Sequence, residues 1–437
     1  MPKFSRGFSL YIVLPLILIW MVSAFTLPVF SSGYFHPVIG QPFPISTLPD
    51  PVDESAPSVA YNSLDHEFLV VWENDRPLAN NDIYAQRISH DSRLISWFYV
   101  AEGTDPDVAY NPKQNDYLVV YSRLVASDID VFGQRVDYTG PFGTEIIIAN
   151  ALDVDEKRPR LDYNTHAAHD SFLVVFNQIY PLPSPEVNVR GQLVTGVAGA
   201  GVGGSNLLTT ENDIAVSATG EWNFNPDVAY NLNHNEFLVV WANNATAGAD
   251  PDAVDIQGRR MTAAGILLPA NPIDESGNAQ EFPAVAAYRL NATTPYLVVF
   301  NDQWNHPEGD VRGYLCTFEG APHTLVNIAA QSSRNESAPA IASSEGLGGY
   351  TVTWNEYNST ENDWDVFGRR VGNNGPLGEV FSIGELLSPS GCGGTNPAVA
   401  GGSPIALVAW TATCFTSSVD IGGRLLGYQV IMPLIAR

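Results

Sequence analysis

The chain is poor in basic residues. Its 437 residues include 21 Lys and Arg against 47 Asp and Glu, a formal net charge of −26. A nucleic-acid partner is excluded, because phosphate binding needs clustered Lys and Arg. Acidity of this kind keeps a protein soluble and can attract divalent cations. We therefore expect no cofactor and leave only calcium open, although no segment fits the full calcium-loop pattern.

Recognisable catalytic motifs are also missing. The sequence has no nucleophile elbow, zinc-protease helix or phosphate-binding loop, and it lacks the repeated Ser-x-Asp-x-Gly-x-Thr box of sialidases. Its eight histidines are scattered, several of them in polar turns. Paired carboxylates for glycoside hydrolysis stay open, because spacing in the sequence cannot pick one pair out of so many acidic residues.

Cysteine is scarce, with only Cys316, Cys392 and Cys414. Their spacing matches no zinc-ligand pattern. In an exported protein Cys392 and Cys414 are a candidate disulfide. Cys316 falls on an expected strand, where a buried thiol behaves as a small hydrophobic residue.

Long apolar runs are confined to the N-terminus. Lys3 and Arg6 precede a nearly apolar stretch over 8–21, and small residues follow at 22–24. This pattern predicts a signal peptide over 1–24, a short linker over 25–39 and a secreted or cell-surface protein. The alternative is an uncleaved anchor, since the apolar stretch can be read on to Phe30. No other segment could span a membrane.

Three short motifs recur in the same order seven times. The first is a proline followed two positions later by an aliphatic residue, and the prolines stand 49 to 67 residues apart. They are Pro57, Pro106, Pro159, Pro226, Pro283, Pro339 and Pro397. The second is an apolar tetrad about a dozen residues on, as in Leu69-Val70-Val71-Trp72. The third begins with Asp or Asn and reaches Gly or Ala three positions later, as in Asp82-Ile83-Tyr84-Ala85. Arg or Gln usually follows, and we expect these side chains to brace neighbouring units.

The repeats predict an all-β fold. Helical periodicity is absent, and each unit offers three clear strands and a weaker fourth. The tetrads are apolar at nearly every position, so both faces of that strand are expected to be buried. We predict a seven-bladed β-propeller of four-stranded antiparallel blades over 40–437. An N-terminal segment within 40–55 is expected to close the ring; the alternatives are a closing strand from 428–435 and an open solenoid.

The unit resembles a repeat of secreted bacterial β-propeller proteins. Residues 55–88 carry the resemblance best, with the tetrad at 69–72 and Asp82-Ile83-Tyr84-Ala85-Gln86-Arg87. It extends over nearly all of the chain after the signal. It implies a seven-bladed propeller outside the cytoplasm and no particular activity. The chain departs from the repeat in an insertion between Val197 and Phe224.

Any site is expected at the channel mouth, where loops enter the first strands and leave the second ones. The candidate ligand-binding residues are Asp105, Asp107, Arg158, Arg160, Trp222, Asn225, Asp227, Trp304 and His306. Trp222 lies in the insertion and could stack on a sugar face.

Three functions follow, in order of preference. The first is a non-catalytic, monomeric binding module for a glycan or a cell-envelope protein. The second is a hydrolase or lyase that acts on a polysaccharide with carboxylates at the channel mouth. The third is a purely structural surface module.

Overall fold

The computed structural model describes 15 ranges of the chain, 38–46, 52–75, 81–166, 169–181, 186–199, 207–208, 214–217, 219–245, 253–288, 290–303, 309–329, 334–359, 362–384, 393–413 and 419–427. Every regular element in these ranges is a β-strand, and they contain no helix. The all-β prediction is therefore confirmed. All of the described strands belong to one compact unit, Phe35–Arg437.

The strands pair in groups that follow the sequence repeats. The first groups are β2 (Glu54–Asn62), β3 (Glu67–Asn74), β4 (Asp82–Ser89) and β5 (Leu94–Glu102), then β6 (Thr104–Asn111), β7 (Asp116–Val125), β8 (Asp128–Asp137) and β9 (Gly140–Ala149). Next are β10 (Asp155–Tyr163), β11 (Ser171–Tyr180), β12 (Glu186–Thr195) and β13 (Ile214–Ala215), then β14 (Trp222–Asn231), β15 (Glu236–Asn244), β16 (Asp255–Thr262) and β17 (Leu267–Asp274). The last are β18 (Gln280–Ala287), β19 (Tyr296–Asp302), β20 (Asp310–Cys316) and β21 (Pro322–Ala329), β22 (Asn335–Ser344), β23 (Gly349–Asn358), β24 (Asp363–Gly372) and β25 (Gly375–Ser382), and β26 (Gly394–Gly401), β27 (Ala406–Ala412) and β28 (Asp420–Leu426) with β1 (Val38–Pro44).

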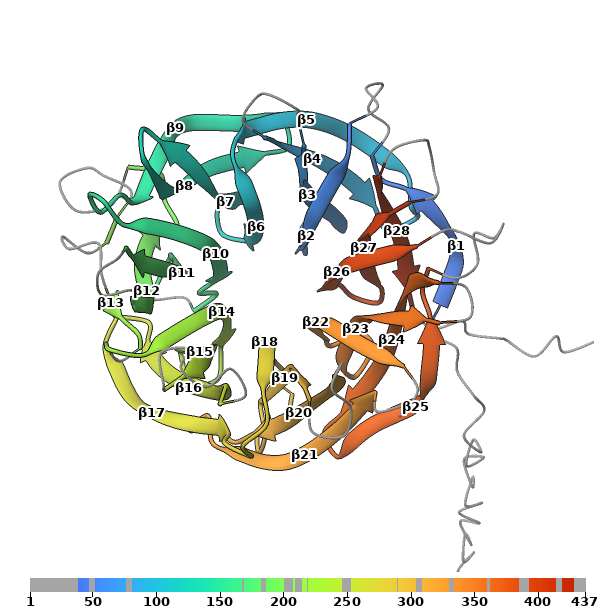
Figure 1. Cartoon of the computed structure of the whole chain (residues 1–437). Helices are drawn as coiled ribbons and strands as arrows, with labels where there is room; N and C mark the ends of the chain where they lie inside the picture. Colours follow the sequence, from blue (N-terminus) through green and yellow to red (C-terminus); the bar gives the residue numbers. More distant parts are fainter. Residues whose placement is uncertain are drawn as a thin grey trace, which may run out of the picture. The chain divides into compact units, whose positions relative to one another are not determined.

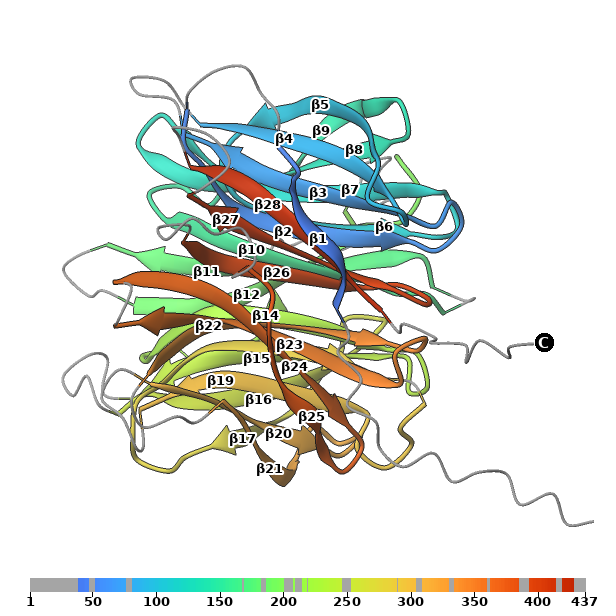
Figure 2. The ribbon, with the colours of Figure 1, turned by 90° about the vertical axis from the view of Figure 1, so that its right-hand side faces the viewer.

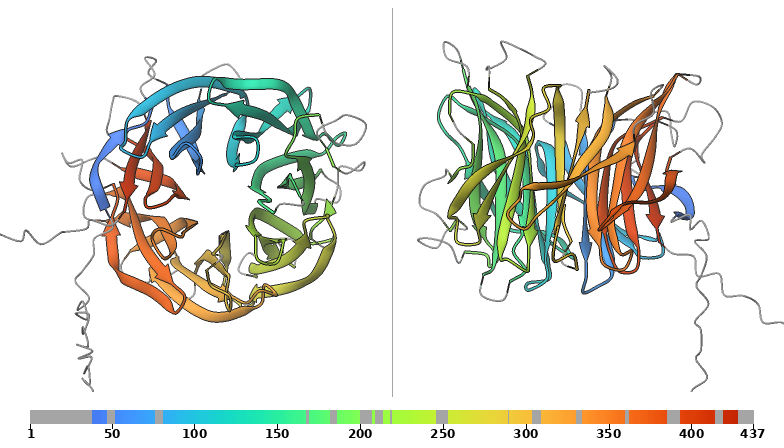
Figure 3. Two further views of the ribbon diagram at one scale, coloured as in Figure 1. Left: turned by 180° about the vertical axis from the view of Figure 1, so that it is seen from behind. Right: turned by 90° about the horizontal axis from the view of Figure 1, so that it is seen from below.

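These groups lie side by side around a central opening (Figure 1). The first strand of each group lies innermost and contacts the first strand of the next group, and β26 contacts β2. The N-terminal strand β1 pairs antiparallel with β28. A single parallel bridge, Val187 with Trp222, joins the groups of β12 and β14 into one larger sheet. Figures 2 and 3 show that the sheets stand on edge, with their faces turned toward one another.

The second strands form the core, as their apolar tetrads require. Phe68, Leu69, Val70 and Val71 are all fully buried on β3, on both faces of the sheet. The hydrophobic clusters cross from one group to the next: Trp72 packs with residues of β26 and β27 such as Leu407. Burial on both faces holds each sheet between its neighbours, because apolar area removed from water stabilises the fold by about 25 cal/mol per Å².

The proline motif forms a bulge on every innermost strand. The residue before each of the seven prolines has a positive φ of 48–54°, and the pairing register with the second strand shifts at each of these points. These residues are Ala56, Asp105, Arg158, Asn225, Phe282, Ala338 and Asn396. The proline that follows fixes its own φ and needs no N–H partner in the interrupted ladder.

Ala338→Gly is expected to stabilise the protein by about 0.5–1 kcal/mol. A non-glycine residue in the left-handed region costs about 1–2 kcal/mol, and part of the gain is lost because Gly has more freedom in the unfolded chain. The shift in denaturant midpoint against wild type measures the effect. Ala342→Gly on the same strand is the control and should destabilise. Equal destabilisation by both changes would show that the bulge is not strained.

Arginines on the third strands bond to neighbouring groups, which confirms the expected bracing. Arg259 donates to the carbonyl of Val216 at 2.9 Å, and Arg369 donates to that of Ile328 at 2.9 Å. Arg424 is buried and donates to Ile383 O at 2.9 Å and to Gly40 O on β1 at 3.1 Å. The guanidinium fork suits this use, because it can reach two carbonyls at once.

Several sequence predictions fall outside the described ranges. The signal peptide over 1–24 lies there, and so do Cys392, Cys414 and the segment 428–435. Cys316 ends β20 as a buried free thiol, as predicted, and burial raises its pKa. Among the described residues, no helix is long and apolar enough to cross a membrane.

Candidate functional site

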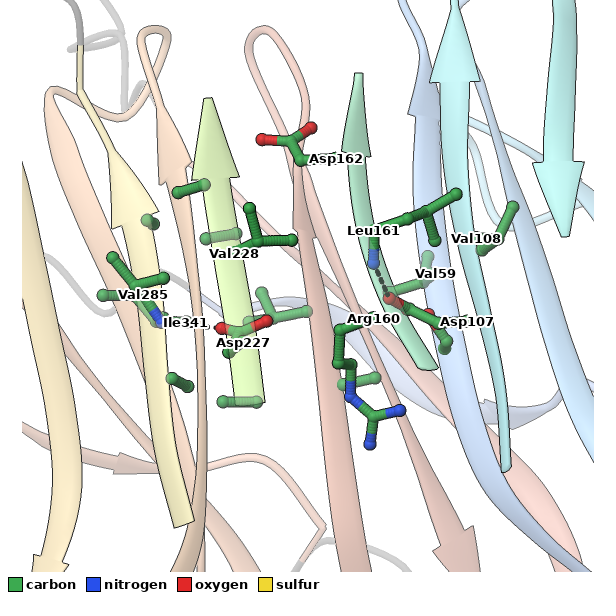
Figure 4. A pocket seen from close by; sticks show the side chains of 18 of the residues that line it. Val59, Asp107, Val108, Arg160, Leu161, Asp162, Asp227, Val228, Val285 and Ile341 are labelled. Carbon is green, nitrogen blue, oxygen red and sulfur yellow. Dashed lines mark hydrogen bonds between the residues drawn. The ribbon is translucent and has the colours of Figure 1, made fainter. Parts of the chain in front are cut away.

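A cavity of about 840 Å³ lies at the centre of the innermost strands. The bulge segments of all seven innermost strands line it, so the proline motif of every repeat faces the same space. Figure 4 shows side chains from several of these strands directed toward one another across this space. A cavity of this size can hold a small ligand or a few sugar units of a chain.

The residue just after each proline decides the chemistry of this cavity. In sequence order these residues are Ser58, Asp107, Arg160, Asp227, Ala284, Ala340 and Ala398. The first four are polar or charged and come from neighbouring strands β2, β6, β10 and β14. The last three are alanines on β18, β22 and β26. At these seven positions the cavity therefore has one polar side and one apolar side.

Asp107 is held by the strands on either side of it. Its Oδ1 accepts a hydrogen bond from Ser58 Oγ at 2.6 Å, and its Oδ2 accepts one from Leu161 N at 3.0 Å (Figure 4). Burial raises the pKa of Asp107, and the nearby Arg160 charge is the largest effect that opposes the rise. These donors favour the ionised form of this carboxyl.

Asp227 is a second carboxyl that lines the cavity. Its Oδ2 accepts a hydrogen bond from Val285 N at 2.7 Å. Burial raises its pKa to about 7, and the negative charge of Asp107 adds to the rise. Arg160 opposes this effect. Near neutral pH, Asp227 is therefore divided between its protonated and ionised forms.

Asp162 is a third carboxyl at the same cavity. It stands where the other six innermost strands have alanine: Ala60, Ala109, Ala229, Ala286, Ala342 and Ala400. Its two oxygens accept hydrogen bonds from Tyr163 N and Tyr230 N, each at 2.7 Å. Burial raises its pKa to about 6, and Asp107 contributes to the rise.

Two arginines face the cavity from β10. Arg160 is half-buried and lies on the strand between those of Asp107 and Asp227, with its guanidinium directed into the open space (Figure 4). Its Nη1 donates to Pro159 O at 2.7 Å. Arg158 is exposed and donates to Asn225 Oδ1.

The structure brings together six of the nine residues proposed from the sequence. Asp105, Asp107, Arg158, Arg160, Asn225 and Asp227 all line the cavity. They lie inside the bulged strands β6, β10 and β14 and not in loops at the mouth, which corrects the expected location. The bulges turn these residues toward the centre because the extra residue breaks the alternation of the strand.

The other three residues have different outcomes. Trp222 is half-buried as the first residue of β14, where it pairs with Asn244, and it is not among the residues that line the cavity. Its expected place in a loop is therefore wrong, since the strand begins earlier than the insertion suggested. Trp304 and His306 lie outside the described residues.

The sequence analysis missed Ser58 and Asp162. A position-by-position alignment of the seven repeats carries the signal for Asp162, because an acid replaces a small residue in one unit only. Ser58 gives no such signal, because a serine beside a proline is common in turns. Its contact with Asp107 depends on the packing of β2 against β6.

Calcium was the cofactor that the acidity left open. In the ranges that the structure describes, no three His, Cys, Asp or Glu side chains are grouped so that they could hold a metal ion. The recurring Asp or Asn of the third motif stands once in each strand group, so these residues are spread around the molecule.

No family model matches the sequence, and no curated protein matches it either. Similar solved structures exist. A prolyl endopeptidase structure has a TM-score of 0.50 at 12% sequence identity. The match includes 84% of this chain but only 46% of the endopeptidase, so this chain spans less than half of that protein's length. The α-L-arabinofuranosidase Arb93A of Fusarium graminearum has a TM-score of 0.48 at 11% identity, with 90% of this chain covering 98% of that one. The Dos1 propeller has a TM-score of 0.45 at 10% identity, with coverages of 89% and 94%. The similarity at a TM-score of 0.50 concerns the fold alone.

The first functional expectation needs correction. The non-catalytic binding module is contradicted, since several of the similar structures are arabinofuranosidases or arabinanases. Their TM-scores of 0.38–0.48 assign no activity to this chain. At 9–12% identity the similarity concerns the fold. The activity is therefore argued below from the cavity.

Proposed function

We propose that this protein is a glycoside hydrolase that cleaves a polysaccharide in the central cavity. One observation carries the proposal: Asp107 and Asp227 face the same cavity from β6 and β14, with Arg160 on the strand between them. Glycoside hydrolysis needs such a pair, with one carboxyl protonated and the other ionised.

Asp227 is the proposed general acid. With a pKa of about 7 it keeps its proton in weakly acidic solution. It gives this proton to the glycosidic oxygen as the bond from the anomeric carbon to that oxygen breaks. Asp227 Oδ1 is the oxygen that does not accept the Val285 N–H, so this oxygen is placed to carry the proton.

Asp107 is the proposed second carboxylate. Ser58 and Leu161 N fix its orientation and favour its charge. It either removes a proton from the attacking water or bonds to the anomeric carbon itself, and in the second course water then releases the sugar. The charge of Arg160, between the two strands, opposes the rise that burial causes in the pKa of Asp107. The proposed reaction assigns the ionised form to Asp107 and the protonated form to Asp227.

The apolar side of the cavity suits a sugar chain. The alanines Ala284, Ala340 and Ala398 leave room for a ring and present methyl groups to its C–H face. The polar side then faces the hydroxyl groups and the glycosidic oxygen. A small number of placed polar groups on a largely apolar wall is the usual form of a ligand site.

We further propose that the sheets form a closed, seven-bladed propeller in a protein exported from the cytoplasm. The circular contacts of the innermost strands and the pairing of β1 with β28 support closure. The N-terminal signal pattern and the resemblance to secreted bacterial repeat proteins favour export. Export would bring the protein to extracellular polysaccharide. A purely structural module, the third function considered, would instead show no turnover of any polysaccharide.

The pH profile of turnover tests the proposed roles. On a panel of soluble polysaccharides, we expect release of reducing ends to rise as Asp107 ionises and to fall as pH passes about 7, where Asp227 loses its proton. In Ser58→Ala the acidic limb should move to higher pH, because Asp107 loses a hydrogen bond that favours its charge. Absence of reducing-end release on every polysaccharide would contradict the proposal.

A further inference from the structure

Arg160 lines the cavity and forms no ion pair with a described carboxylate; in this it resembles Arg259 and Arg369, which bond to backbone carbonyls. Within the described ranges, six arginines have a carboxylate within 4 Å. These pairs are Arg87–Glu67, Arg123–Glu145, Arg135–Asp116, Arg260–Glu236, Arg312–Asp302 and Arg334–Glu356. Arg160 forms no such ion pair with any described residue, although two aspartates lie on the neighbouring strands. Its one described hydrogen bond is to the carbonyl of Pro159.

The aspartates around Arg160 are already bonded to other donors. Asp107 accepts Ser58 Oγ and Leu161 N, and Asp162 accepts two backbone N–H groups. Asp227 accepts Val285 N. Arg160 thus affects Asp107 and Asp227 through its charge but does not bond to them. Its guanidinium is directed into the cavity, where a ligand can reach it (Figure 4).

Arg158 places a second guanidinium on the same wall. It is exposed and lines the same cavity, and it comes from the bulge of the same strand. Across the cavity, the wall is made mostly of alanines and aliphatic residues, with Glu345 as its carboxylate. Two arginine forks at one site, in a chain with only 21 basic residues, are suited to an anionic group.

We propose that Arg160, with Arg158, binds a carboxylate of the sugar chain, so that the substrate is a polysaccharide that contains uronic acid. This inference rests on the proposed function and names its substrate class. A carboxylate matches the planar fork of arginine with two parallel hydrogen bonds. The same fork would fix the ring against the alanine wall and bring the glycosidic oxygen toward Asp227.

The negative charge of the whole chain does not prevent this binding. Charges farther than about 8 Å are largely screened at physiological ionic strength. Within the cavity, the backbone and hydroxyl donors already bonded to Asp107 and Asp162 reduce their effect on a ligand. The local contacts of Arg160 therefore decide the preference.

Binding to an inactive variant tests the proposal separately from catalysis. In the Asp227→Asn background, affinity is measured for oligomers of galacturonate, glucuronate, mannuronate and guluronate. Each oligomer is compared with its own carboxyl-reduced, neutral form, and a sulfated galactan oligomer is included. We expect at least one uronate oligomer to bind about 10- to 100-fold more tightly than its reduced form.

Arginine variants should remove that preference. Arg160→Gln is expected to bind the charged and reduced forms with affinities within about threefold of each other, and Arg160→Lys should retain part of the difference. Arg190→Gln on β12 is the matched control: Arg190 is half-buried, bonds to Gln178 Oε1 at 2.9 Å and lies away from the cavity, so the preference should be unchanged.

Three results would overturn the substrate assignment. They are equal binding of every charged and reduced pair, a preference for the sulfated oligomer alone, or a preference that survives Arg160→Gln. Turnover of a neutral polysaccharide by the wild-type protein, combined with any of these results, would leave the hydrolase proposal in place. Strong uronate binding without any turnover would contradict the hydrolase proposal alone.

Discussion

Asp227→Asn is expected to lower turnover by about 100- to 10,000-fold, because the variant has no carboxyl proton to give to the leaving oxygen. The change keeps the shape of the side chain, and the amide oxygen can still accept the Val285 N–H. Initial rates of reducing-end release measure the loss. Asp105→Asn is the control: Asp105 lines the same cavity two residues from Asp107 but has no role in the proposed reaction. It should lose less than tenfold.

The same variant should be more stable than wild type at high pH. The pKa of Asp227 in the folded protein is about 7, raised above the ordinary value of 3.8. Folding therefore favours the protonated carboxyl, and this contribution is fully present below pH 3.8 and is lost as pH rises through about 7. Asparagine stays neutral, so Asp227→Asn should raise Tm at pH 8 and change it little at pH 4. Unchanged turnover, or a lower Tm at pH 8, would contradict the role given to Asp227.

Arg135→Met is expected to destabilise the fold by about 3–5 kcal/mol. Arg135 is 2% exposed, and its Nη1 lies 2.9 Å from Asp116 Oδ2. It also donates to Thr195 O in the neighbouring strand group. Removal of Arg135 leaves a buried carboxylate without its cation, and burial already raises the pKa of Asp116 to about 6 despite the arginine. Chemical denaturation at pH 8 measures the loss.

Two further variants separate the ion pair from general packing. Lys157→Met removes an exposed pair with Asp155 and should cost less than about 1 kcal/mol. The double variant Arg135→Met with Asp116→Leu removes both buried charges and should recover much of the lost stability. The loss of unfolding free energy in the double variant is compared with the sum of the losses in Arg135→Met and Asp116→Leu. If the two are equal, the destabilisation comes from lost packing and not from the unpaired charge.

The sevenfold recurrence of the proline motif made part of the site predictable from the sequence. The residues that flank Pro106, Pro159 and Pro226 attracted attention because the motif recurs, and Asp107, Arg160 and Asp227 indeed share one cavity. Trp222 was judged from the length of an insertion, which does not show where a strand begins. Asp162 could not be predicted as a site residue from its own repeat, because only the comparison of all seven repeats shows that its position otherwise holds alanine.

The sequence by itself determined the all-β fold and the position of each first strand, because alternation, apolar tetrads and proline bulges act over a few residues. Only the tertiary structure decided that Asp107 and Asp227 face one cavity, with Arg160 on the strand between them. They are far apart in the chain, and the packing of β6, β10 and β14 brings them together. The raised pKa values of both carboxyls also depend on that packing, because burial and neighbouring charges set a pKa and neither is visible in a linear sequence.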